Sequence, residues 1–159
     1  IYAESLSEDG KGTTVNVTTA RGGSVRNVIA ERAACGIDFR VRKQSEADRV
    51  HESIMAYQPR DPRVKVTVEG GLNRPPLELT EANQALFDEV RQRASARLGL
   101  ELEGAEVGGG SDGNFTSAIG VPTLDGLGAV GAGPHARHEQ VDIEATVGRV
   151  ALLAAILRA

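Results

Sequence analysis

Strand-type patterns dominate the first part of the chain. β-branched and polar residues alternate from Thr13 to Ala20, a second apolar run extends from Ala33 to Val41, and clean alternation returns from Val64 to Glu69. A period of two places successive side chains on opposite faces of a strand. We therefore expect three antiparallel strands whose outer face is polar enough for solvent or for a partner.

A helix is expected between the second and third of these strands. Residues 46–56 begin a pattern that places Val50, Ile54 and Tyr57 on one side, and Ser45 stands where an N-cap residue accepts a backbone hydrogen bond. A helix on one face of an antiparallel sheet makes a small α+β module.

The segment 70–79 interrupts both patterns, because its sequence GGLNRPPLEL contains two glycines and two prolines. We predict that the chain divides there into two domains, residues 1–72 and residues 73–159. Directly after the break, Thr80 is expected to cap a longer helix that Gly99 ends.

The second domain is expected to alternate strands and helices. A strand-type segment at 100–107 leads into three glycines, after which Ser111 or Asp112 can cap a short helix, and residues 121–124 form another apolar strand. This order predicts an α/β unit with a loop at the carboxyl end of a strand, where open α/β sheets place their ligands.

The final helix is expected to begin at Asp142, an N-cap residue. Apolar residues then recur at helical spacing, which predicts that one side of this helix packs in the core. The residues assigned to that side are Ile143, Val147, Val150, Ala151, Ala154 and Leu157.

The composition limits the possible partners. The chain has 159 residues and a net charge of −4, without a long basic run, which argues against nucleic-acid binding through phosphate neutralisation. No apolar run reaches the roughly 18 residues of a membrane span, so we expect a soluble protein, with cytoplasm and periplasm both open. The single cysteine, Cys35, excludes an internal disulfide, and its apolar neighbours predict a buried thiol.

The glycine-rich turn and its helix start form the first candidate site. Gly109, Gly110 and Ser111 belong to GGGSDG, which lacks the spacing of a phosphate loop and of a dinucleotide fingerprint. Backbone N–H groups at a helix start could still hold a carboxylate, a reacting carbonyl or another anion. A tight turn that only reverses the chain is the structural alternative.

Histidines and arginines supply the other candidates. His135 follows Gly-Pro and is either a metal ligand or a surface residue, and its HxxHE spacing differs from the HExxH of zincins. Arg74 projects from the stiff Pro-rich segment and can clamp a carboxylate or form an interdomain ion pair. Asn27 and Arg40 lie near the ends of two strand-type segments and can be binding or structural residues.

Six motifs occur in a familiar order: GTTVNV from Gly12, the GG-x(3)-NVI of residues 22–29, DFR from Asp38, NRPP from Asn73, GGGSDG and GPHARHE. Together they resemble the carboxyl-terminal half of M20 family metallopeptidases, of the glutamate carboxypeptidase-like branch. The resemblance covers nearly the whole chain. It implies a two-domain, often dimeric enzyme that uses two bridged zinc ions to hydrolyse an amide bond next to a free carboxylate.

The resemblance also implies roles for individual residues. His135 corresponds to a zinc ligand, because family members often read HSPNE where this chain reads HARHE, and His138 replaces the usual Asn. Asn27, Arg40 and Arg74 match lid positions associated with substrate binding, with Arg74 as the carboxylate clamp. Gly109, Gly110 and Ser111 match the loop that lines the substrate pocket.

The chain lacks several metal-ligand motifs of the family pattern. The HxD motif, the bridging Asp and the Glu-Glu pair with the general base do not occur in it. Because a catalytic zinc needs about three protein ligands, we expect a fragment that is inactive alone. It would comprise part of the lid (residues 1–72) and the end of the catalytic domain (residues 73–159).

In the intact enzyme we expect a small peptide or N-acyl amino acid as substrate and a homodimer formed through the lid. The competing hypothesis is a non-catalytic dimerisation or assembly module, in which exposed lid strands pair with another copy.

Overall fold

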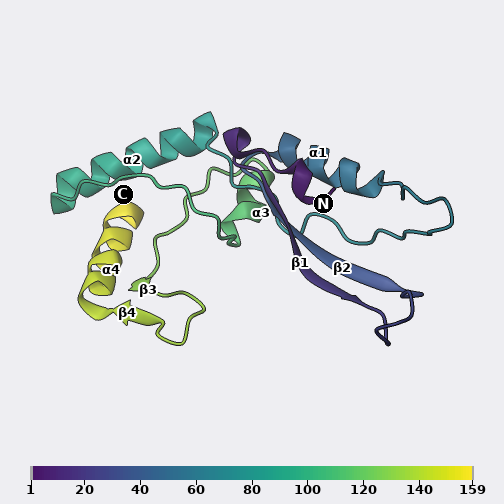
Figure 1. The fold of residues 1–159 in the computed structure, drawn as a ribbon. Helices are drawn as coiled ribbons and strands as arrows, with labels where there is room; N and C mark the ends of the chain where they lie inside the picture. Colours follow the sequence, from purple (N-terminus) through teal and green to yellow (C-terminus); the bar gives the residue numbers. More distant parts are fainter. Residues whose placement is uncertain (1, 159) are drawn as a thin grey trace. The chain divides into compact units, whose positions relative to one another are not determined.

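The computed structural model describes residues 2–158 and contains helices together with two small antiparallel sheets (Figure 1). This mixture agrees with the predicted α/β class at its coarsest level. The chain divides into two compact units, Ile1–Glu78 and Leu79–Ala159.

A two-stranded hairpin organises the first unit. β1 (Thr14–Gly22) pairs antiparallel with β2 (Ala33–Arg40), in a register that runs from Thr14 opposite Arg40 to Gly22 opposite Ala33. The register shifts between Val17 and Thr19, as it does at a β-bulge. Both strands lie where the alternating pattern predicts them.

The apolar core of this unit lies at the base of the hairpin. Val15 of β1 and Val50 of α1 (Gln44–Met55) are fully buried, and Ala3 packs with them. Partly buried side chains surround this group; they are Leu6, Val17, Ile37, Phe39 and Ile54. The helix therefore covers the face of the hairpin that carries the apolar alternation, as predicted.

The start of α1 differs from the prediction. Lys43, rather than Ser45, occupies the N-cap position, and its side chain makes no capping hydrogen bond. Instead the backbone N–H of Gln44 donates to Oε1 of Glu78 at 2.7 Å. A carboxylate from a distant segment thus accepts a hydrogen bond at the positive end of the helix. Local sequence spacing could not predict this contact.

Two expectations for the first unit are wrong. Residues 64–69 form no strand, and Val64 and Val66 remain exposed, because no neighbouring strand within the described residues offers hydrogen bonds to them. Cys35 is exposed rather than buried, since it lies opposite Ala20 in the part of the hairpin beyond the core.

Local capping signals define the two long helices of the second unit. α2 (Glu81–Leu98) begins where the hydroxyl of Thr80 accepts from the N–H of Asn83 at 3.1 Å, and it ends at Gly99 with φ +64°. α4 (Ile143–Leu157) begins where Asp142 accepts from the N–H of Ala145 at 2.9 Å. All three terminal residues were predicted from the sequence.

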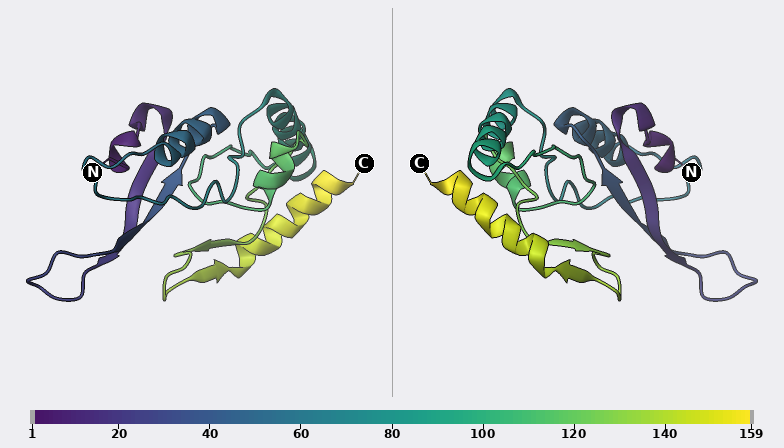
Figure 2. Two further views of the ribbon diagram at one scale, coloured as in Figure 1. Left: turned by 90° about the vertical axis from the view of Figure 1, so that its right-hand side faces the viewer. Right: turned by 90° about the vertical axis from the view of Figure 1, so that its left-hand side faces the viewer.

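The two long helices pack against each other (Figures 1 and 2). Val90 and Ala94 of α2 and Leu152 and Ala155 of α4 are buried. Two arginines of α2 strengthen the contact by donating to carbonyl groups at the end of α4; the pairs are Arg93 with Ile156, and Arg97 with Ala155 and Arg158. Cations at this negative helix end are favoured electrostatically.

The predicted core side of α4 is wrong. Ile143, Val147, Val150 and Leu157 are 78%, 64%, 63% and 81% exposed, whereas Leu152 is 2% exposed. The helix is apolar on several sides, so periodicity does not identify which side α2 covers. The exposed residues form a stripe, here called the outer stripe of α4, which comprises Ile143, Val147, Val150, Ala151, Ala154 and Leu157.

A buried asparagine organises the short helix α3 (Gly113–Ala118). Asn83 of α2 donates to the hydroxyl of Ser117 at 3.1 Å and accepts from the N–H of Thr123 at 2.8 Å. Residues 121–124 are thereby held in place, but they form no strand, and neither do residues 100–107. Both strand predictions are wrong, because no strand among the described residues pairs with these segments.

A second hairpin closes the fold. β3 (Val130–Ala132) pairs antiparallel with β4 (Gln140–Asp142), and residues 133–139 connect them. None of the helices in residues 2–158 is long and apolar enough to cross a membrane.

Candidate functional site

His135 lies in the loop that joins β3 to β4. Two turns build this loop: the N–H of Ala136 donates to the carbonyl of Gly133 at 2.9 Å, and the N–H of Glu139 donates to the carbonyl of Ala136 at 3.1 Å. The short strands on either side fix the ends of the loop. The side chain of His135 is exposed, so its imidazole can meet a ligand.

The backbone of His135 is strained. Its φ of +64° makes it the one non-glycine residue with positive φ in the described part of the chain. This left-handed conformation costs about 1–3 kcal/mol for residues with a Cβ and persists only where the surroundings enforce it. The loop therefore holds the backbone of His135 in a conformation that is unfavourable without the surrounding structure.

The glycine-rich turn precedes α3. Gly109 and Gly110 are exposed, and Ser111 is half-buried. The N–H of Ser111 donates to Oδ1 of Asn114 at 2.9 Å, and the hydroxyl of Ser111 accepts from the N–H of Gly113 at 3.1 Å. The turn thus uses its own side chains to satisfy the helix start, a role for Asn114 that the sequence analysis missed.

Asn27 and Arg40 lie at opposite ends of the first hairpin. Asn27 is exposed in the loop beyond β1, and Arg40 ends β2 opposite Thr14. Because β2 advances by roughly 3.3 Å per residue, its two ends are about 23 Å apart. Nε of Arg40 lies 3.5 Å from Oδ2 of Asp38, and both side chains are exposed. One small molecule cannot contact both ends of the same hairpin.

Arg74 is half-buried in the irregular segment that follows α1. The same segment carries Glu78, which caps α1 through Gln44. This hydrogen bond ties the segment to α1 at a position four residues beyond Arg74.

Metal-binding groups are sparse. Within residues 2–158, no three or more His, Cys, Asp or Glu side chains are arranged to hold a metal ion. The exposed imidazole of His135 fits the chemistry of a single zinc ligand, but a catalytic zinc needs about three protein ligands. His135 can therefore supply only one of the ligands that such a site needs.

The strongest electrostatic cluster surrounds Glu46 of α1, which no sequence motif indicated. Its carboxylate accepts from Thr13 at 2.9 Å and from Arg49 at 2.7 Å, and it lies 3.1 Å from Nζ of Lys11. The side chain of Glu46 is 8% exposed. Hydrogen bonds from Arg49, Lys11 and Thr13 outweigh the cost of desolvation and lower the pKa of Glu46 to about 2. This cluster joins the segment just before β1 to α1 and is structural.

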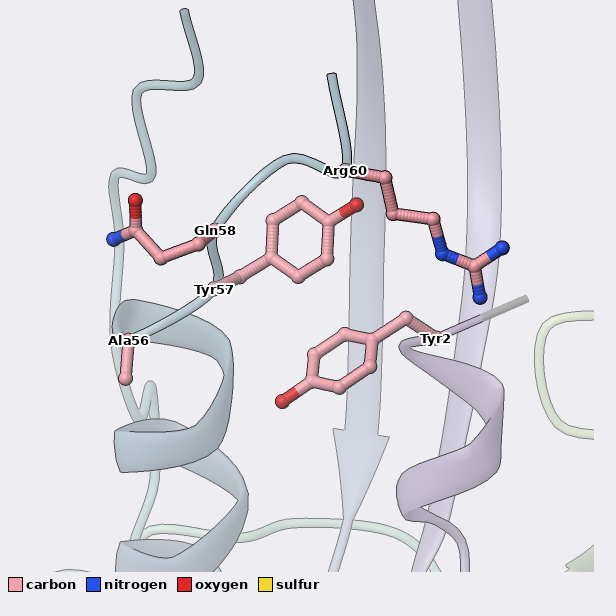
Figure 3. A pocket seen from close by; sticks show the side chains of 5 residues that line it. All are labelled: Tyr2, Ala56, Tyr57, Gln58 and Arg60. Carbon is pink, nitrogen blue, oxygen red and sulfur yellow. The ribbon is translucent and has the colours of Figure 1, made fainter. Parts of the chain in front are cut away.

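A shallow pocket lies at the far end of α1 (Figure 3). The rings of Tyr2 and Tyr57 face each other with centroids 4.9 Å apart, and Arg60 extends beside them. The hydroxyl of Tyr2 donates to the carbonyl of Ser53 at 3.0 Å. None of the site residues predicted from the sequence lines this pocket.

Comparison with known proteins decides the family. The model of peptidase family M20/M25/M40 matches residues 3–159, which is nearly the entire chain. The chain belongs to this family. The predicted resemblance to M20 peptidases is thus confirmed.

Among curated proteins, the M20 chain is similar to Carboxypeptidase G2 of Pseudomonas sp. (strain RS-16). The two sequences are 28% identical over 158 residues, which cover 96% of this chain and 37% of that relative. The M20 chain therefore spans little more than a third of the length of the relative it matches.

Proposed function

We propose that this chain is the carboxyl-terminal part of a zinc-dependent M20 peptidase or amidohydrolase that cleaves an amide bond next to a free carboxylate. The family match over residues 3–159 carries this proposal. In it, residues 1–72 belong to a lid domain and residues 73–159 to the catalytic domain. The substrate class is a small peptide or an N-acyl amino acid.

The proposal gives each candidate residue a task. His135 supplies one zinc ligand from the loop between β3 and β4, and the remaining ligands and the general base lie on polypeptide outside this chain. Arg74 binds the substrate carboxylate, since a guanidinium can donate two parallel hydrogen bonds to it. Gly109, Gly110 and Ser111 contact other parts of the substrate, whereas Asn27 and Arg40 contact substrates bound in different sites of a homodimer.

Two structural observations support a longer parent protein. The outer stripe of α4 leaves large apolar side chains in water, which a folded domain avoids by covering them. Residues 64–69, 100–107 and 121–124 have strand-type sequences but no strand partners among the described residues. Additional polypeptide that contributes strands and an apolar surface would satisfy both requirements.

The experiment is to join this chain to the upstream part of its parent protein, or of a longer M20 relative, and to assay hydrolysis of N-acyl glutamate and dipeptides with Zn²⁺. The chain alone should be inactive. His135→Ala should lower the activity of the joined protein by about 100-fold or more, because an incomplete ligand set no longer holds a catalytic zinc.

His51→Ala is the matched control, because His51 is a half-buried histidine of α1 with no proposed role at the site. It should leave the activity within about twofold. If His135→Ala retains the activity of the unsubstituted joined protein, His135 is not a zinc ligand and the assignment fails.

The first hairpin favours assembly as a second function. β1 and β2 pair only with each other among the described residues, and a two-stranded sheet has exposed edges that can accept another strand. The separation of Asn27 from Arg40 also suits a homodimer, in which the two ends of one hairpin serve different sites. A zinc-independent dimer of the chain alone in sedimentation experiments would support assembly, whereas a monomer would contradict it.

A further inference from the structure

The loop that carries His135 also contains a second histidine that packs against a glycine. Gly133 has φ +68°, and a Cβ placed on it would lie 2.8 Å from Cδ2 and 2.9 Å from Nε2 of His138. Real Cβ atoms do not approach other atoms so closely. The ring of His138 therefore occupies space that only a glycine leaves open.

This contact joins the two turns of the loop. The first turn runs from Gly133 to Ala136 and includes His135, and the second runs from Ala136 to Glu139 and includes His138. The ring of His138 thus reaches from the second turn back to the first residue of the first turn. Each turn is closed by a single backbone hydrogen bond, so the ring adds a connection that the backbone alone does not provide.

His135 needs such a connection because its left-handed backbone is unfavourable by itself. The carbonyl of Gly133 accepts the bond that closes the turn around His135, so fixing Gly133 also fixes this turn. We infer that His138 is a positioning residue, which holds His135 in its left-handed conformation by packing against Gly133. The inference rests on the proposed function only in giving His135 a ligand role.

The test is to measure the backbone conformation of His135 by NMR in the full chain without metal. A left-handed residue has a short distance between its own amide proton and Hα, which gives a strong cross-peak. His138→Ala should reduce this cross-peak at His135 by at least half, since the ring contact is lost. His138→Phe should retain it, because a planar ring of similar size can still pack against Gly133.

Arg137→Ala is the matched control, because Arg137 is an exposed neighbour in the same loop. It should leave the His135 cross-peak unchanged. In all variants, cross-strand contacts between Val130 and Asp142 report whether the hairpin is intact. The inference is wrong if His138→Ala leaves the conformation of His135 unaltered, or if Arg137→Ala or His138→Phe changes it as much as His138→Ala.

A double substitution tests the contact itself. Gly133→Ala should disturb the loop through both its positive φ and its clash with His138. Removing the ring as well, in Gly133→Ala with His138→Ala, should remove the clash and leave only the backbone penalty. The double variant should therefore be less destabilised than the sum of the two single variants, and strict additivity would overturn the proposed contact.

Failure of this inference and failure of the proposed function give different results. Titration of the joined protein with Zn²⁺, followed through the ring resonances of His135, tests the ligand role separately. A left-handed His135 that depends on His138 but does not respond to Zn²⁺ would contradict the proposed function and leave the positioning role intact. A His135 that responds to Zn²⁺ but keeps its cross-peak unchanged in His138→Ala would support the proposed function and contradict the positioning role.

Discussion

At the scale of single residues, the interactions of Glu46 and His135 have different origins. Glu46 is stabilised by groups from the segment before β1 and from its own helix, whereas His135 is held in an unfavourable conformation by its loop. His135 could be singled out from the sequence, because Gly-Pro-His in a loop is a local signal. The contact of Glu46 with Thr13 could not, since the two residues are 33 positions apart.

The pKa of Glu46 predicts how stability changes with pH. Its folded-state pKa of about 2 lies below its ordinary value of 4.5, so the ionised carboxylate stabilises the fold above pH 4.5. That stabilisation should disappear as the pH falls from about 4.5 towards about 2. Thermal unfolding across this range should show that the Tm of the chain falls as the pH falls. The fall in Tm should be smaller in Glu46→Gln than in the unsubstituted chain.

The matched control for this prediction is Glu52→Gln, on the exposed side of the same helix. It should keep the pH dependence of the unsubstituted chain. An equal pH dependence in Glu46→Gln and the unsubstituted chain would show that other carboxylates produce the acid sensitivity.

The proposed role of Arg74 predicts a specific kinetic change. Arg74→Lys in the joined protein should raise KM by about 10- to 100-fold, because Lys keeps the charge but loses the two parallel hydrogen bonds to a carboxylate. Steady-state kinetics with a substrate and with its carboxamide analogue measure the effect. Equal losses for both substrates would contradict a carboxylate clamp.

At the scale of elements, the two ends of α2 and the start of α4 were predicted correctly, whereas the start of α1, several strands and the buried face of α4 were not. The caps at Thr80 and Asp142 involve residues only three positions apart, so the sequence contains both partners. The predicted strand at 64–69 needs a neighbour that local sequence does not specify. The buried side of α4 depends on α2, and an apolar helix gives no periodic signal of that contact.

The two sides of α4 should differ in their effect on stability. Leu152→Ala should destabilise the chain by about 2–5 kcal/mol, because it leaves a cavity against α2. Val150→Ala should change stability by less than about 0.5 kcal/mol, since Val150 is exposed in the outer stripe. Denaturant unfolding measures both values, and similar losses for the two variants would place the wrong side of α4 in the core.

At the scale of the whole molecule, each of the two compact units contains a hairpin and helices. Each unit also leaves large apolar side chains exposed. In the described part of the chain, strand-type segments that pair with no other strand occur in both units. The family match and the shorter length relative to Carboxypeptidase G2 are consistent with the proposal that the parent protein supplies these partners.

Hydrogen exchange should test whether the parent protein supplies these strand partners. In the chain alone, amides of residues 64–69 and 101–107 should exchange faster than those of α2, because they are not in helices or strands. In the joined protein, residues 101–107 should become protected by at least tenfold as they gain strand partners. Unchanged exchange after joining would contradict the proposal that upstream polypeptide completes the catalytic domain.

The sequence by itself determined the family, the helix ends at Thr80, Gly99 and Asp142, and the two strands of the first hairpin. Each of these depends on residue identity, on spacing within a few positions or on alternation along one strand. They required no knowledge of which distant segments meet.

Only the tertiary structure decided which apolar surfaces are covered, which strand-type segments find partners, and how the Glu46 cluster and the His135 loop are built. Burial and strand pairing are relations between segments, and their free energy comes from surfaces that must meet in space. A chain can therefore contain the pattern of a strand or of a buried helix face and still leave it exposed, as residues 64–69 and the outer stripe of α4 do.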